Sequence, residues 1–177
     1  MSAHRLIVEN TGLLRQAVSL LQQLNDDQFR RHDPAKYPSC IGKHIRHCVD
    51  HYDKFIAGLD AGKINYDERP RDTSVEIDRR VAIVRLQQLG EALQHIPKAV
   101  LSDTVFINSN ESEHNNCSAN WNVSSVAREL QFLISHTVHH YALVAMILRL
   151  QNVEVDSEFG FAQSTIKHER SRKLCAQ

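Results

Sequence analysis

Apolar side chains recur every three to four residues through four long stretches of this 177-residue chain. That spacing places them on one face of an α-helix and predicts helices over about residues 3–25, 39–62, 73–95 and 124–152. Helices of this kind bury their apolar faces most simply against one another. We therefore expect an all-α four-helix bundle, folded as one domain over residues 1–177.

The segments between these helices carry different signals. Pro70 and a dense run of charges predict a loop over residues 63–73. Residues 99–121 are expected to form a long connection between the third and fourth helices, with a short hairpin, because Val105-Phe106-Ile107 is β-like and the residues after it are polar. A short C-terminal tail follows the fourth helix.

Composition excludes several classes of partner. Lysine plus arginine (21) balance aspartate plus glutamate (21), and no basic run occurs, so we expect no nucleic-acid partner. No apolar run approaches the length of about 20 residues that a membrane span needs, and the first residues lack the apolar core of a secretory signal. The four cysteines form no C-x-x-C pair or disulfide framework. These features predict a cytoplasmic protein without a membrane partner.

Six of the eleven histidines lie in two clusters. The clusters are His44, His47 and His51 in the second predicted helix and His136, His139 and His140 in the fourth. Residues three or four apart share a helix face, so His136 and His140 can present two imidazoles to one point. A third imidazole from a facing helix would complete a metal site, and neutral imidazole suits zinc, nickel, copper and iron.

The position of each histidine relative to the apolar stripes ranks the candidates. His136 and His140 lie among the apolar residues of their helix, whereas His139 lies at the edge of the stripe. In the other cluster His47 is the middle member and the best placed to meet a facing pair. The alternative is that all are core or boundary histidines, each satisfied by a hydrogen bond. Two clusters on two bundle helices favour a shared metal site.

The absence of two motifs narrows the kind of site. Di-iron bundles carry Glu-x-x-His on two helices, and zinc proteases commonly carry His-Glu-x-x-His. Neither motif occurs in this chain. A mononuclear site made by three histidines is the remaining interpretation.

The segments Ile41-Gly42-Lys43-His44-Ile45-Arg46-His47-Cys48-Val49-Asp50 and Leu133-Ile134-Ser135-His136-Thr137-Val138-His139-His140-Tyr141-Ala142-Leu143 resemble the DinB-like (DinB/YfiT) superfamily of helical-bundle proteins. Residues 65–72 and 158–165 also look like segments of one branch of that family. The resemblance implies an up-down-down-up bundle with one divalent metal, for which we expect zinc or nickel. It also implies His47, His136 and His140 as the metal ligands.

The same resemblance implies two kinds of function. Some characterised relatives are thiol-dependent enzymes, so the metal would activate a low-molecular-weight thiol or a water against a small electrophile, as in a thiol S-transferase or a hydrolase. The alternative is a binding or stress-response bundle that the metal only stabilises. Bundles of this kind often pair through exposed helix faces, which makes a homodimer one expected state.

Six further residues have expected roles near the metal. Glu129, on the face of His136, is a candidate general base, or a carboxylate favoured at a helix start. Asp50, one turn after His47, would accept the N–H of that ligand, or lie exposed. Tyr141 would line the site or belong to the core. The remaining histidines, His44, His51 and His139, would support the three ligands.

Overall fold

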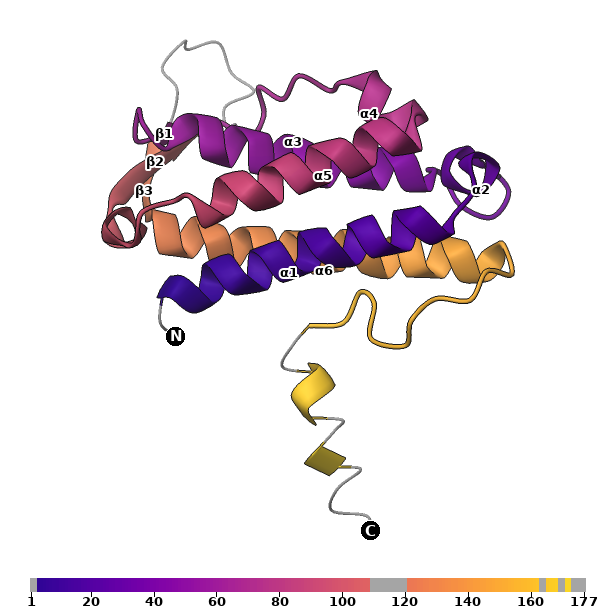
Figure 1. The fold of residues 1–177 in the computed structure, drawn as a ribbon. Helices are drawn as coiled ribbons and strands as arrows, with labels where there is room; N and C mark the ends of the chain where they lie inside the picture. Colours follow the sequence, from indigo (N-terminus) through magenta and orange to yellow (C-terminus); the bar gives the residue numbers. More distant parts are fainter. Residues whose placement is uncertain (1–2, 109–120, 163–164, 169–170, 173–177) are drawn as a thin grey trace.

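The computed structural model of the chain describes residues 3–108, 121–162, 165–168 and 171–172. Helices make up most of this structure, and four of them are long (Figure 1). None of the helices in these ranges is both long and apolar enough to cross a membrane. In chain order the elements are α1 (Ala3–Gln23), α2 (Asp26–Arg30), α3 (Ile41–Gly58), β1 (Lys63–Ile64), α4 (Thr73–Ile77), α5 (Arg79–Gln94), the 3₁₀ helix η1 (Lys98–Ser102), β2 (Thr104–Asn108), β3 (Trp121–Ser125) and α6 (Val126–Leu150).

The four long helices, α1, α3, α5 and α6, correspond to the four segments with a helical apolar period. Helices α1 and α3 each pack against both α5 and α6. In Figure 1, α1 and α6 run in one direction while α3 and α5 run in the other. Their apolar faces meet in one core, whose largest fully buried side chains include Phe29, Phe55, Tyr52, Tyr141, Leu14, Leu21, Ile41, Ile45, Leu86 and Leu93.

The stretch predicted as one helix over residues 73–95 is instead divided at Asp78. The Asp78 backbone is extended (φ −116°, ψ 107°), and its carboxylate accepts hydrogen bonds from the amides of Arg80 and Val81. Aspartate is among the best residues for this N-cap position, so it starts a new helix there. The short α4 packs on α3 at Gly42, where a Cβ would lie 1.9 Å from the Glu76 carbonyl oxygen.

A three-stranded sheet lies at one end of the long helices (Figure 1). Strand β1 pairs parallel to β2, and β2 pairs antiparallel to β3 from Thr104 opposite Ser125 to Asn108 opposite Trp121. The β2–β3 pair occupies the connection for which a hairpin is predicted, and residues 109–120 lie outside the described part of the chain. The expectation of a purely α-helical chain is therefore corrected to a mostly helical fold with a small sheet.

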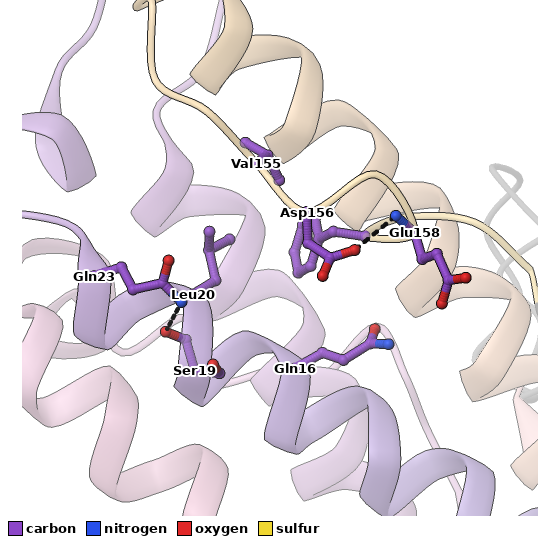
Figure 2. A pocket seen from close by; sticks show the side chains of 8 residues that line it. Gln16, Ser19, Leu20, Gln23, Val155, Asp156 and Glu158 are labelled. Carbon is purple, nitrogen blue, oxygen red and sulfur yellow. Dashed lines mark hydrogen bonds between the residues drawn. The ribbon is translucent and has the colours of Figure 1, made fainter.

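The segment after α6 returns along α1 and α6. Phe159 is buried and stacks on Tyr141, with ring centroids 4.8 Å apart and ring planes 9° apart. Gly160, at φ +81°, allows this approach, because a Cβ would lie 2.7 Å from the Ala142 nitrogen. A cavity of about 180 Å³ separates this segment from α1 (Figure 2), and it is lined by Gln16, Ser19, Leu20, Gln23, Val155, Asp156, Glu158 and Phe159. No histidine lines this cavity, so it is not the predicted metal site.

Candidate metal centre

Three of the clustered histidines come together between two helices. His47 extends from α3, and His136 and His140 extend from consecutive turns of α6. One nitrogen of each imidazole can be chosen so that all three lie within 4.8 Å of one another. Their ring centroids are 4.5 to 4.9 Å apart, and all three side chains are partly buried. We call His47, His136 and His140 the histidine triad.

The spacing of the triad fits a single metal ion. A tetrahedral ion with nitrogen ligands at about 2.0–2.1 Å holds those nitrogens about 3.3 Å apart. Nε2 of His47 lies 3.1 Å from Nε2 of His136. Nδ1 of His136 is buried and has no hydrogen-bond partner among the described residues. Buried nitrogens are normally satisfied, so this cluster has unused capacity for a ligand.

Burial keeps the triad neutral. It lowers the pKa of His47 and of His136 to about 3, and that of His140 to about 4. The neighbouring imidazoles add to the effect because each charged ring would repel the next. At neutral pH every ring of the triad therefore offers an unprotonated nitrogen, which is the form that binds metal ions.

His44 contacts the triad from one side. Its Nδ1 lies 3.0 Å from Nδ1 of His140, so one of these two nitrogens carries a proton and donates a hydrogen bond to the other. If His140 is the donor, its Nε2 is left unprotonated and can bind an ion. His44 therefore contacts a member of the triad, although its supporting role stays a prediction, and burial lowers its own pKa.

His51 contacts the triad from the other side, and both of its nitrogens are engaged. Its Nε2 lies 3.0 Å from Nη1 of Arg69, which can only donate, so Nε2 must be the acceptor. Nδ1 then carries the proton and donates a hydrogen bond to the His47 carbonyl oxygen at 2.8 Å. The His51 ring lies 4.0 Å from that of His136, centroid to centroid. His51 is therefore neutral and borders the site, and neither of its nitrogens is free to bind an ion.

Glu129 lies at the start of α6 and is separated from the triad by aromatic rings. Its carboxylate is 1% exposed and accepts hydrogen bonds from Tyr66 Oη (2.9 Å), Ser124 Oγ (2.6 Å) and Arg128 Nη1 (2.9 Å). Tyr66 in turn stacks on His51, at 5.4 Å between centroids. The carboxylate raises the pKa of the Tyr66 phenol, in addition to the larger effect of burial. Glu129 is therefore connected to the triad indirectly, through Tyr66 and the rings that Tyr66 contacts.

The remaining predicted residues lie at different distances from the triad. His139 is exposed and meets His140 edge-on, at 5.2 Å between ring centroids. Asp50 is buried, and its Oδ2 has no hydrogen-bond partner among the described residues, so it does not accept a proton from His47 as expected. Tyr141 belongs to the core, where its hydroxyl donates to the Leu13 carbonyl oxygen.

Three residues of the site were not singled out from the sequence. Arg69 and Tyr66 come from the segment between β1 and α4, and Phe132 lies one turn before His136 on α6. Phe132 lies within 5.3 Å of Tyr66 and 5.5 Å of His136, measured between ring centroids. For Tyr66 and Arg69, the indication in the sequence was the resemblance of residues 65–72 to a recurring segment of the family.

Comparison with known proteins identifies the family of this chain. A family model described as the DinB superfamily matches residues 11–144, a range that contains the whole triad. The chain is 28% identical over 158 residues to a protein named FK506-binding protein 5 from Rhizopus delemar. That similarity covers 89% of this chain and 36% of the relative, so the chain spans little more than a third of the relative's length. No solved structure matches the chain.

Proposed function

Because the chain belongs to the DinB superfamily and its histidine triad has the spacing to hold an ion, we propose that this protein is a metal-dependent enzyme. His47, His136 and His140 would hold one divalent transition metal, zinc or nickel. A metal bound there lowers the pKa of a coordinated water or thiol, which makes either a nucleophile near neutral pH. The substrates would be a small electrophile and either water or a low-molecular-weight thiol.

The unused nitrogen of the triad is the observation that carries this proposal. Three imidazoles are held neutral within 4.8 Å of one another, and Nδ1 of His136 has no partner among the described residues. Buried ring nitrogens normally have hydrogen-bond partners; Nε2 of His136 contacts Nε2 of His47 at 3.1 Å, whereas its Nδ1 has no partner in the described structure. Three protein ligands also leave a coordination position open, as catalytic zinc sites do.

The residues around the triad would position it. His44 orients His140 through the contact between their Nδ1 atoms, and His51 forms a wall beside His136. The general-base role of Glu129 stays a prediction. Because its oxygens already accept three hydrogen bonds, we favour a positioning role in which Glu129 holds Tyr66 against His51.

The predictions about bundle topology, cellular location and partners belong to the same proposal. The directions of the four long helices support the up-down-down-up bundle that the family resemblance implies. We propose that the protein acts in the cytoplasm as one domain, without a nucleic-acid or membrane partner. Pairing into a homodimer would use exposed helix faces.

Metal analysis tests the proposal first. Protein purified without chelators should contain about one zinc or nickel ion per chain by elemental analysis. The metal-loaded protein should then accelerate the reaction of cysteine with 1-chloro-2,4-dinitrobenzene. A His140→Ala variant should lose metal and activity while it keeps the melting profile of the metal-free wild type. Collapse of the fold in that variant would favour the metal-stabilised binding bundle, and wild-type protein without metal would contradict both functions.

A further inference from the structure

Arg69 differs from the other arginines that are withdrawn from solvent. Within the described ranges, Arg46, Arg79 and Arg85 are also partly buried, and each has a nitrogen within 4.0 Å of a carboxylate oxygen. Arg69 has no such ion pair there. Its hydrogen-bond partner is the neutral imidazole of His51, at 3.0 Å. A partly buried guanidinium is normally matched by a negative charge, so this positive charge lacks its expected partner.

Most of the hydrogen-bonding capacity of Arg69 is also unused. A guanidinium has five N–H donors in a planar fork, and only Nη1 has a hydrogen bond in the structure described here. The buried Asp50 is near enough for its pKa to be lowered by the charge of Arg69, although burial raises it more. No ion pair joins the two residues. The fork therefore remains available to a second planar anion.

This fork lies beside the histidine triad. Arg69 contacts His51, whose ring centroid is 4.0 Å from that of His136 and 4.5 Å from that of His47. One imidazole ring therefore separates the guanidinium from the triad. A small molecule with its reacting group at the triad would need only a short chain to place a second group on Arg69.

We propose that Arg69 is an anion-recognition residue and that the ligand of the triad carries a carboxylate. This inference rests on the proposed function, because it names the class of substrate or thiol that the same site takes. A carboxylate matches the arginine fork with two parallel hydrogen bonds.

The first experiment uses metal-free protein, so that it does not depend on the proposed metal. The probes are 3-mercaptopropionate and its neutral amide, 3-mercaptopropionamide, which have the same length. Binding is followed by the NMR signals of the arginine Nε–H groups, with the Arg69→Met variant identifying the Arg69 signal. We expect the acid to shift that signal and to bind at least about tenfold more tightly than the amide.

The second experiment uses protein loaded with Co²⁺, whose absorption changes when a thiolate binds. The wild type should again prefer the acid over the amide by about tenfold or more. Arg69→Met should remove this preference, so that acid and amide bind equally, while Arg69→Lys should keep part of it. The matched control is Arg80→Met, which removes an exposed arginine of α5 and should behave as the wild type.

Equal binding of acid and amide by the wild type would overturn the inference. So would an acid preference that survives in Arg69→Met, because Arg69 would then only position His51. Failure of the proposed function looks different. In that case Co²⁺ does not bind to the triad, and the metal-free experiment still decides whether Arg69 recognises a carboxylate.

Discussion

Two groups of buried polar side chains contact α6, and they differ in how completely hydrogen bonds satisfy them. The first, which we call the Asn10 cluster, consists of Asn10, Tyr52 and Thr137. The Asn10 amide donates to the carbonyl oxygens of Leu6 and Leu130 and accepts from Tyr52 Oη at 2.7 Å. Thr137 Oγ1 completes the cluster by donating to Tyr52 Oη at 3.3 Å.

The histidine triad is the second group, and it lies on the neighbouring face of the same helix. His136 immediately precedes Thr137 in the chain. A cluster whose hydrogen bonds are formed and a cluster with an unpartnered nitrogen are therefore one residue apart on the same helix. In the triad, Nε2 of His47 lies 3.1 Å from Nε2 of His136, and Nδ1 of His136 has no partner in the described structure. The difference teaches that burial of polar groups alone does not mark a site. Unused hydrogen-bonding capacity does, because a buried group without a partner is unfavourable unless a ligand completes it.

Removal of a triad member should give the largest effect. We expect His140→Ala to lower metal affinity at least about 100-fold, or about 2.7 kcal/mol, because two imidazoles hold an ion less tightly than three. The stability of the metal-free protein should change by less than about 1 kcal/mol, since the ring is only partly buried. Competition with a chromophoric chelator measures the affinity, and urea unfolding measures the stability.

The neighbouring exposed residue provides the control for this prediction. His139→Ala removes an imidazole from the same turn of α6 and should leave metal affinity within about threefold of the wild type. Equal losses in the two variants would mean that the triad is not the binding site.

The opposite pattern is expected for the Asn10 cluster. Asn10→Ala removes the amide that joins α1 to Leu130 and Tyr52, and it leaves two buried groups without their partner. We expect a loss of about 2–3 kcal/mol in the free energy of unfolding. Metal affinity should remain within about threefold. Parallel losses of stability and metal affinity would remove the distinction between the two groups.

The features that depend on helical periodicity could be predicted from the sequence. The apolar stripes predicted the four long helices, because each stripe has to be buried whatever its partner. The spacing of His136 and His140 and the central position of His47 selected the three histidines that the structure brings together. Their role as ligands stays a prediction.

Features that depend on tertiary contacts could not be predicted from the sequence. Asp78 lies inside a continuous apolar period, and the helix divides there, where the Asp78 carboxylate caps α5 and the separate α4 packs on α3 at Gly42. The choice between His47 and His51 depends on Arg69, which occupies Nε2 of His51. Arg69 is distant from both in the chain, and no local pattern indicates where its loop returns.

A smaller effect is expected for the residue that supports the triad. His44→Ala removes the ring that contacts Nδ1 of His140. Loss of a hydrogen-bond partner that orients a ligand should lower metal affinity about tenfold, or about 1.4 kcal/mol. The chelator competition measures this loss. A loss as large as that in His140→Ala would instead make His44 a fourth ligand, and the structural role of the metal would gain support.

Lowering the pH should have the smallest effect on metal affinity. Ordinary histidines with a pKa near 6.5 would become protonated between pH 7.5 and pH 5.5, and three of them would lose affinity for a metal by about 1000-fold. The triad has pKa values lowered to about 3, 3 and 4, so its nitrogens remain unprotonated over this range. We expect metal affinity to change less than about threefold, as measured by competition with a chelator whose own titration is known.

The stability of the metal-free protein should respond to acid over the same range. Because the folded pKa values lie below 6.5, the unfolded chain binds protons first as the pH falls. The stability contributed by the neutral triad is therefore complete above about pH 6.5 and decreases as the pH falls toward 3 to 4. Urea unfolding from pH 7.5 to 4.5 should show this decrease, and it should be smaller in His140→Ala, which retains two of the three titrating rings. A metal affinity that falls steeply near pH 6.5 would mean that the triad is protonated like exposed histidines, and the contrast with the Asn10 cluster would then lose its physical basis.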